Sequence, residues 1–169
     1  AYRSLPECRP CSIAGHLSCY RWNMLMKIRP RVAADDALLT ALWERSVRAT
    51  HDFIAEDDIQ RLYPLVRDSY LPALEAWVWE NPDASPGGFI ATSDDTVQML
   101  FIEPAQRGQG IGRKLLDHVR RPGLKVDVNE QNPQAHGFYR RYGFVDCGRS
   151  ETDGEGRPFP IIHMQLQDQ

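Results

Sequence analysis

Residues 106–114 read Gln-Arg-Gly-Gln-Gly-Ile-Gly-Arg-Lys and join an apolar run to an amphipathic run. The apolar run, residues 97–102, has the length of a strand, and residues 111–119 repeat apolar side chains at helical spacing. A glycine-rich turn between a strand and a helix exposes backbone N–H groups, and the helix N-terminus adds positive potential there. Arg113 and Lys114 stand in the first helical turn, where the helix dipole disfavours cations. A bound polyphosphate would reverse that penalty, so the segment predicts a phosphate-binding site.

Two common phosphate-binding motifs do not fit this spacing. A P-loop requires Gly-x-x-x-x-Gly-Lys-Ser/Thr, and counting from Gly108 places Arg113 where the second glycine must stand. A dinucleotide-binding turn requires Gly-x-Gly-x-x-Gly, whereas the third glycine here, Gly112, comes one position early. Asp127 lies near the place of a ribose-binding acid, but hairpins rather than β-α-β units precede the turn. The spacing therefore argues against both a P-loop nucleotide and a dinucleotide.

Hydrophobic periodicity and turn residues predict strands and helices along the rest of the chain. The predicted strands are residues 27–32, 74–80, 88–92, 96–102, 124–128, 144–147 and 161–166. The predicted helices are residues 35–49, 57–70, 111–119 and 132–142. We expect Pro64 to interrupt the second helix and Asn132 to cap the last one, with Pro133 at its first position. This order predicts a mixed α/β sheet with helices on its faces.

Composition and charge narrow the class of protein. The chain has 169 residues, 42% hydrophobic and 25% charged, which is typical of a globular domain. A net charge of −3 argues against a nucleic-acid partner, because binding to phosphate backbones needs a basic face. No apolar run approaches the ~18 residues of a membrane-spanning helix, and residues 1–23 lack the pattern of a secretory signal. We therefore expect a cytoplasmic protein that does not contact a membrane.

The N-terminal region has a composition of its own. Cys8, Cys11 and Cys19 lie there together with His16, which is superficially similar to a zinc knuckle, but His16 and Cys19 stand too close together. We predict neither a metal site nor a disulfide framework. Cys147 lies in a predicted strand without a nearby base and is expected to be buried. Residues 1–23 are interpreted as an extension outside a domain that comprises residues 24–169.

The pattern Arg107-x-x-Gly110-x-Gly112 resembles the coenzyme A signature of the GCN5-related N-acetyltransferase (GNAT) family. Residues 99–104 look like that family's fourth strand, and residues 129–144 look like its fifth strand and fourth helix. The resemblance covers residues 26–166, with features of a subgroup of small bacterial acetyltransferases, and residues 1–23 have no counterpart. It implies an α/β (α+β) GNAT fold. Such a fold has a mixed central sheet of about six to seven strands, splayed between the fourth and fifth, and about four flanking helices.

The resemblance also implies acetyl-CoA as cosubstrate, without a metal. The pantetheine arm would pair with exposed backbone of the fourth strand, and the diphosphate would lie on the amides of residues 108–113, where glycines permit close approach. Asn129 and Asn132 resemble the positions that meet the pantetheine amides. The implied acetyl-CoA-binding residues are Leu100, Phe101, Ile102, Arg107, Gly108, Gln109, Gly110, Ile111, Gly112, Arg113, Asn129, Asn132, Ala135, Phe138 and Tyr139.

Acetyl transfer to an amine needs a neutral nucleophile and a proton donor for the leaving thiolate. A lysine-like amine has a pKa near ~10.4 and must first lose a proton. Tyr139 matches the family's tyrosine beside the thioester sulfur, where it would donate a hydrogen bond to the departing thiolate; the alternative is a core tyrosine. Glu103 and His51 are the two candidate bases, each with a purely structural alternative. The candidate acceptor-site residues are Trp43, Arg48, His51 and Asp52.

Two functions follow as hypotheses. The first is an acetyl-CoA-dependent N-acetyltransferase that acts directly on a primary amine of an unidentified small-molecule or peptide acceptor. Direct transfer is expected because Cys147 has no base that would support a cysteine-linked intermediate. The alternative is an acyl-CoA-binding sensor or regulatory module without turnover. A homodimer is common among proteins of such folds, but no segment indicates which edge would pair.

Overall fold

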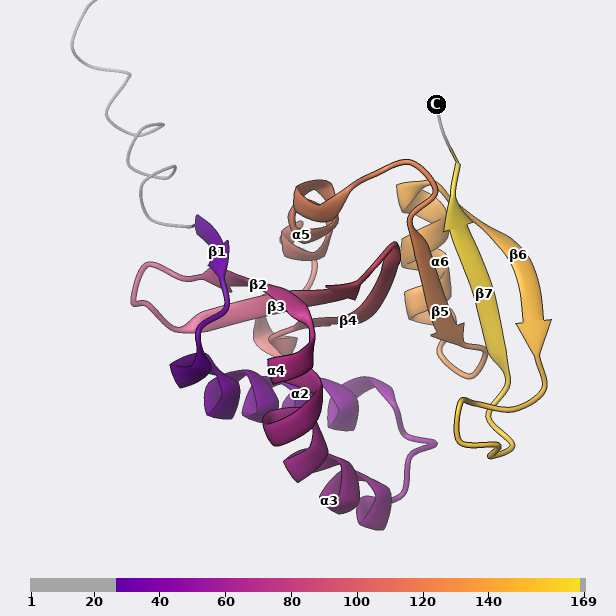
Figure 1. Cartoon of the computed structure of the whole chain (residues 1–169), viewed down its shortest axis with the longest axis horizontal. Coiled ribbons are helices and arrows are strands. Elements are labelled where there is room, and N and C mark those ends of the chain that lie inside the picture. Colours follow the sequence, from indigo (N-terminus) through magenta and orange to yellow (C-terminus); the bar gives the residue numbers. More distant parts are fainter. Residues whose placement is uncertain (1–26, 168–169) are drawn as a thin grey trace, which may run out of the picture.

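The computed structural model describes residues 27–167, which form a mixed sheet between two layers of helices (Figure 1). The strands are β1 (Lys27–Pro30), β2 (Glu75–Glu80), β3 (Pro86–Ser93), β4 (Thr96–Ile102), β5 (Lys125–Asn129), β6 (Phe144–Ser150) and β7 (Ile161–Leu166). The helices are α2 (Asp36–Thr50), α3 (Glu56–Leu65), the short α4 (Leu71–Ala73), α5 (Ile111–Val119) and α6 (Pro133–Tyr142). The predicted extension, with Cys8, Cys11, His16 and Cys19, lies outside the described residues. Within them, no helix is long and apolar enough to span a membrane.

The seven strands lie in the order β1-β2-β3-β4-β5-β7-β6. Among the described strands, only β4 and β5 run parallel, and the other neighbours are antiparallel. A parallel pair needs a crossover connection, which the glycine-rich turn and α5 provide. The mixed sheet with about four flanking helices that the sequence predicted is therefore confirmed.

The sheet opens between β4 and β5. Their pairing is limited to Thr96 with Lys125 and Val97 with Val126. Directly after Val97, the register of β3 and β4 shifts, so that Gln98 has no partner on β3. A bulge of this kind bends its strand, and from there β4 turns away from β5 (Figure 1). The rest of β4 therefore has no strand partner on its β5 side.

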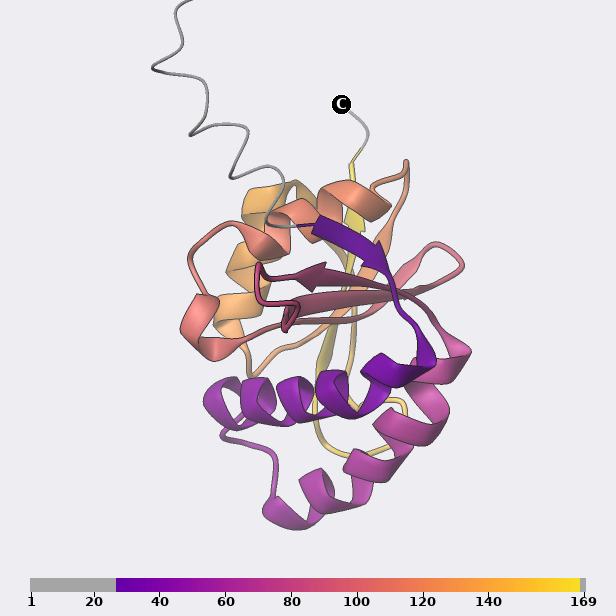
Figure 2. The same ribbon diagram turned by 90° about the vertical axis from the view of Figure 1, so that its left-hand side faces the viewer.

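Two hydrophobic clusters hold the helices to the sheet, one on each face. Leu115 and Leu116 of α5 pack with strand residues such as Val126 on one face. Leu39 and Leu42 of α2 pack on the other face with strand residues and with side chains of α3. Figure 2 shows this division, with α2 and α3 below the sheet and α5 above it. Each helix is thus fixed by its apolar stripe.

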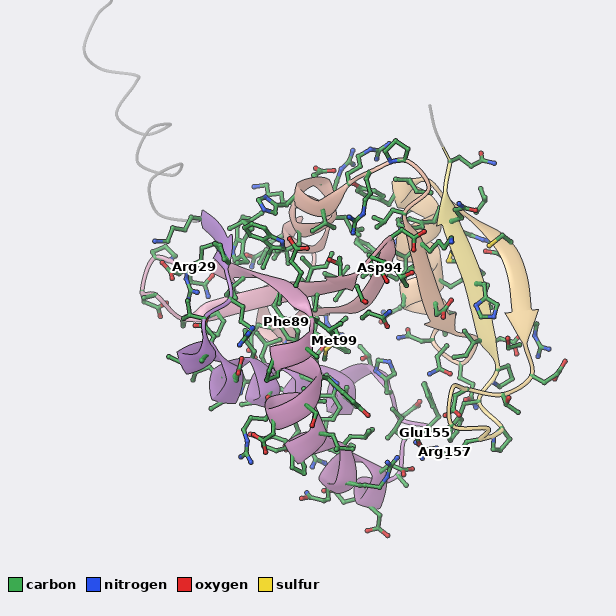
Figure 3. All side chains as sticks on the ribbon, in the orientation of Figure 1. Arg29, Phe89, Asp94, Met99, Glu155 and Arg157 are labelled. Atoms are coloured by element: carbon green, nitrogen blue, oxygen red, sulfur yellow. The ribbon has the colours of Figure 1, made fainter. Side chains whose placement is uncertain are left out.

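The loop that joins β6 to β7 forms ion pairs with α3. These pairs connect the two halves of the sheet where β4 and β5 separate. Arg157 Nη1 donates to Asp58 Oδ1 of α3 at 2.6 Å, and Arg61 Nη2 lies 3.0 Å from Glu155 Oε2. Figure 3 shows Glu155 and Arg157 beside the N-terminal end of α3. The opening is therefore bridged by ion pairs at its wide end.

Two local predictions were wrong. Pro64 does not interrupt the second helix: it lies in the last turn of α3, and a π-helical turn over Val66–Tyr70 continues into α4. A proline near the helix end removes one hydrogen bond without stopping the chain's helical path. Cys147 is exposed rather than buried, because the register of β6 shifts between Asp146 and Gly148 on this edge strand. The bulge changes which face the side chain occupies.

Candidate active site

A cleft of about 350 Å³ lies between the glycine-rich turn, the end of β4, the C-terminus of α2 and α6. It is called the larger cleft below, in contrast to the smaller cavity that adjoins it. A smaller cavity of about 160 Å³ lies in the opening between β4 and β5 and shares His51, Asn132 and Tyr139 with the larger cleft. Asn129 lines the smaller cavity, and Gln109 lines neither. The predicted acetyl-CoA-binding residues that line the larger cleft are Leu100, Phe101, Ile102, Arg107, Gly108, Gly110, Ile111, Gly112, Arg113, Asn132, Ala135, Phe138 and Tyr139.

The glycine-rich turn presents open backbone to the larger cleft. Gly108 and Gly110 have φ angles of +78° and +81°, a left-handed conformation that favours glycine. A Cβ atom at either position would meet nothing within 4 Å, so the space in front of these residues is free. Gly110 is also the N-cap of α5, where unpaired N–H groups and the helix dipole favour an anion. The turn is therefore suited to bind phosphate through its backbone.

Cationic side chains surround this turn. Arg107, Arg113 and Arg141 line the larger cleft, and none of them forms an ion pair within residues 27–167. The Arg107 guanidinium instead donates to the Ser46 hydroxyl, with an Nη2–Oγ distance of 3.2 Å. Among the residues that the structure describes, no Asp or Glu lines the larger cleft. The cleft therefore carries a positive potential that matches a polyphosphate.

Tyr139 of α6 lines both the larger cleft and the smaller cavity. Its ring packs edge-on against Phe138 and Phe144, with centroid distances of 5.2 and 5.4 Å. Burial raises the pKa of the Tyr139 hydroxyl well above its usual range, so the group stays protonated at neutral pH. The hydroxyl makes no hydrogen bond to another side chain of residues 27–167 and is available as a donor in the cavity.

Asn132 and His51 belong to one chain of hydrogen bonds. The Ala135 N–H donates to Asn132 Oδ1 at 3.2 Å, which leaves the Asn132 amide nitrogen facing His51 Nε2 at 3.4 Å. His51 Nδ1 lies 2.7 Å from Thr50 Oγ1, whose hydroxyl donates to the Ser46 carbonyl. Because the Thr50 hydroxyl donates its hydrogen to Ser46, its oxygen accepts a hydrogen bond from His51, and the proton of the neutral ring is on Nδ1. The lone pair of the ring is then on Nε2, which faces the Asn132 amide. His51 is therefore arranged to accept a proton at Nε2.

The environment of His51 keeps this ring neutral. Burial lowers the pKa of His51 below its ordinary value of 6.5, and the positive charge of Arg107 acts in the same direction. Asp52 opposes this shift with a smaller effect. At neutral pH the imidazole therefore stays unprotonated at Nε2.

The depressed pKa of His51 predicts a pH-dependent stability. The unfolded chain takes up a proton near pH 6.5, whereas the folded chain resists it, so the contribution of neutral His51 is full above that pH. It is lost as the pH falls through the lower folded pKa. We expect His51→Gln to flatten the dependence of Tm on pH in the range below 6.5. Thermal unfolding across that range measures it, and parallel curves for the two proteins would contradict the prediction.

The other predicted catalytic and acceptor-site residues lie outside both cavities. The Glu103 carboxylate accepts three hydrogen bonds from Arg45, at 2.7, 3.0 and 3.3 Å. Trp43 is buried in the α2 side of the core and lines a separate apolar cavity of about 420 Å³. Arg48 is paired with carboxylates of α2 and α3 on the surface, and Asp52 is exposed. Of the four candidate acceptor-site residues, only His51 lines the larger cleft or the smaller cavity.

Several residues line the larger cleft that sequence reasoning did not single out. Ser46 and Thr50 lie one helical turn apart on α2, a spacing that could have placed them beside His51. Arg141 lies two residues after Tyr139 on α6, and its positive charge could have indicated a phosphate-binding residue. The others are Gln106 and Gln134. Within residues 27–167, no three His, Cys, Asp or Glu side chains are grouped to hold a metal ion.

Known proteins are similar to this chain in sequence and in fold. Residues 67–167 match the family model of the acetyltransferase (GNAT) domain. The chain is 42% identical over 143 residues to the peptidyl-lysine N-acetyltransferase YjaB of Salmonella typhimurium, covering 83% of this chain and 98% of that protein. Identity to YjaB of Escherichia coli is 43%, over 83% of this chain and 97% of that one. The solution structure of apo-form YjaB from Escherichia coli aligns with a TM-score of 0.77 at 41% identity, covering 85% of this chain and 98% of that one.

The chain belongs to the GNAT family of acetyltransferases. It is an N-acetyltransferase, and enzymes of this class use acetyl-CoA as cosubstrate. The family, the fold and the enzyme class predicted from the sequence are therefore confirmed.

Proposed function

We propose that this enzyme transfers the acetyl group of acetyl-CoA directly to the primary amine of a lysine side chain in a peptide or protein. Two relatives named as peptidyl-lysine N-acetyltransferases support this acceptor, because they share 42–43% identity over nearly their full length. The observation that carries the proposal is the larger cleft, in which an anion-binding turn, the free edge of β4, His51 and Tyr139 meet.

The donor occupies the larger cleft in this proposal. The diphosphate lies on the amides of residues 108–113, with Arg107, Arg113 and Arg141 around it. The pantetheine arm pairs with backbone groups of β4 that β5 leaves free. Asn129 supports the same placement, because its buried Oδ1 has no hydrogen bond within residues 27–167 and can accept one from a pantetheine amide.

The acetyl group moves in a single displacement. The amine nitrogen attacks the thioester carbonyl carbon, a C–N bond forms, and the C–S bond breaks. Tyr139 donates a hydrogen bond to the sulfur as negative charge develops there. Complete proton transfer from Tyr139 is unfavourable, because a phenol near ~10 is a weaker acid than a thiol near ~8.5 and burial raises its pKa further. The thiolate therefore acquires its proton from solvent.

Proton removal from the amine is assigned to His51, directly or through one water. The 3.4 Å separation between His51 Nε2 and the Asn132 amide is long, so an incoming donor can replace that contact. Glu103 remains the second candidate base, and its carboxylate is held by Arg45. Within residues 27–167, Cys147 lines none of the three cavities, which supports direct transfer over a cysteine-linked intermediate.

The two candidate bases predict different outcomes. We expect His51→Gln to lower kcat about 100-fold at neutral pH, since general base catalysis contributes about 10²–10⁴-fold. Glu103→Gln is expected to change kcat less than about threefold, because its partner is a surface arginine outside the cleft. Initial rates of thiol release with both variants measure the difference. A loss of activity confined to Glu103→Gln would assign the base to Glu103 instead.

One experiment separates turnover from binding alone. The full chain is incubated with acetyl-CoA and a lysine peptide whose α-amine is blocked, and free thiol and acetylated peptide are measured together. The control peptide carries ε-acetylated lysine in place of lysine. Stoichiometric thiol release with acetylation of the ε-amine supports the proposal. Calorimetric binding of acetyl-CoA without thiol release on any amine would favour the sensor function. The domain limits, the cytoplasmic location and the homodimer stay predictions.

A further inference from the structure

Three side chains from three strands form a hydrogen-bonded row on one face of the sheet. Asp127 Oδ1 on β5 lies 2.6 Å from His163 Nδ1 on β7, and His163 Nε2 lies 2.7 Å from Ser150 Oγ on β6. The neighbouring residues Val126 and Val128 are buried against α5 and α6, so Asp127 belongs to the opposite face. Among the described elements, no helix covers that face of β5 and β7 (Figure 1).

The row adjoins the catalytic centre. Asp127 lines the smaller cavity together with Tyr139 and His51. It is the one carboxylate that lines either the larger cleft or the smaller cavity in the described part of the chain. Its Oδ2 atom has no hydrogen-bond or ion-pair partner within residues 27–167, and its side chain is 58% exposed. The residue that carries this free carboxylate oxygen therefore borders an otherwise neutral or cationic site.

The charges at the two ends of the site differ in sign. Arg107, Arg113 and Arg141 line the end at the glycine-rich turn, whereas Asp127 lines the end between β4 and β5. An anionic donor and a cationic acceptor would each meet the opposite charge. A lysine-like amine, with a pKa near ~10.4, arrives as the ammonium ion at neutral pH.

We propose that Asp127 is a binding site for the ammonium group of the acceptor, which determines specificity for cationic amines; this inference rests on the proposed function. His163 donates from Nδ1 to Oδ1 and Ser150 orients the ring from the other side, so the two are positioning residues. With Oδ1 engaged, Oδ2 is left to accept a charge-assisted hydrogen bond from the ammonium group. Because a carboxylate also opposes deprotonation, Asp127 acts on acceptor capture rather than on the chemical step.

The same order of side chains occurs in serine hydrolases, where the serine is the nucleophile. That function would require substrate access to Ser150, and Ser150 lines none of the three cavities of the described residues. The cavity lies at the Asp127 end of the row. The geometry therefore favours ammonium binding by the carboxylate over nucleophilic attack by the hydroxyl.

The test compares Asp127→Asn with Asp146→Asn. Asp146 also accepts a hydrogen bond from a histidine, His136 Nε2 at 2.8 Å, but its partners lie on α6. The coenzyme A complex of the full chain is titrated with a blocked lysine peptide in a calorimeter. We expect about tenfold weaker peptide binding for Asp127→Asn and no change for Asp146→Asn. The inference is overturned if Asp127→Asn binds the peptide as tightly as the wild-type protein does. It is also overturned if the wild-type protein does not bind the peptide.

Steady-state rates give a second readout. Asp127→Asn is expected to raise KM for the lysine peptide about tenfold, with kcat and KM for acetyl-CoA nearly unchanged. A fluorinated ethylamine, neutral at the assay pH, should show no such rise. His163→Gln is expected to raise the peptide KM about threefold, since it loosens the carboxylate without removing its charge. An equal KM increase for the neutral amine would overturn the inference, because charge would then not be recognised.

The outcomes for the inference and for the proposed function are distinguishable. Peptide binding that depends on Asp127, without any acetyl transfer, supports the subsite and contradicts the proposed function. Acetyl transfer with a peptide KM that is independent of Asp127 does the reverse. Circular dichroism and Tm verify folding of each variant, and Asp127→Ser replaces Asp127→Asn if the latter is unfolded.

Discussion

Replacing Tyr139 with phenylalanine is expected to lower kcat for lysine-peptide acetylation about 100-fold. The substitution removes the hydroxyl that donates to the departing sulfur but keeps the ring contacts with Phe138 and Phe144. Affinity for acetyl-CoA should therefore change less than about threefold. Because burial holds the pKa of this hydroxyl above its usual range, Tyr139 should not produce an alkaline fall in rate below about pH 10. Initial rates of thiol release and calorimetric titration with acetyl-CoA measure the two effects.

Tyr142→Phe is the matched control for this prediction. Tyr142 lies on the same helix and donates its hydroxyl to Asp117 Oδ1 at 2.7 Å, but it lines neither the larger cleft nor the smaller cavity. Its removal should leave kcat within about twofold, the size expected of a surface hydrogen bond far from the reacting atoms. A wild-type kcat in Tyr139→Phe would show that Tyr139 serves the core alone. A parallel fall in acetyl-CoA affinity would assign it to donor binding.

Replacing Gly110 with aspartate is expected to weaken coenzyme A binding about 100-fold. The new carboxylate would stand in the open space before the turn, close to the diphosphate. Two like charges about 4 Å apart repel by about 4 kcal/mol at an effective dielectric constant near 20, and solvent reduces this further. Isothermal titration with coenzyme A measures the loss, which should become smaller as the salt concentration rises.

Gly110→Asn separates charge from shape in this experiment. Asparagine has the size of aspartate and tolerates the left-handed backbone that Gly110 adopts, with a φ of +81°. We expect the asparagine variant to lose less than about tenfold in coenzyme A affinity, since it adds no charge. Equal losses in both variants, unaffected by salt, would mean that the side chain blocks the turn sterically and that charge plays no part.

Local patterns predicted most elements of the fold. Residues 96–102 and 111–119 were predicted with the bounds that the structure has, because apolar period and turn residues agree there. Asn132 was predicted to cap α6, and its side chain accepts the hydrogen bond from the Ala135 N–H. The predictions of a helix break at Pro64 and of a buried Cys147 were wrong, because both features depend on irregularities of a helix or strand that the surrounding structure determines.

The candidate site also combines residues that the sequence indicates with residues that it does not. Residues of the glycine-rich turn and of α6 were recognised because they are close in sequence and carry specific spacing. Asp127 stands near the place of a ribose-binding acid and has no other local signal, and no pattern around His163 or Ser150 indicates a site. Their contact arises from the pairing of β5 with β7 and of β7 with β6. Strand register, rather than any motif, brings these three side chains together.

The sequence alone thus predicts the donor half of the proposed site, because glycine spacing and a helix N-terminus act over a few consecutive residues. The proposed acceptor half depends on tertiary structure. The bulge at Gln98 turns β4 away from β5, and only then do His51 from the end of α2, Tyr139 from α6 and Asp127 from β5 line one cavity. Side chains that are distant in sequence meet through packing and strand pairing, and no local pattern records those contacts.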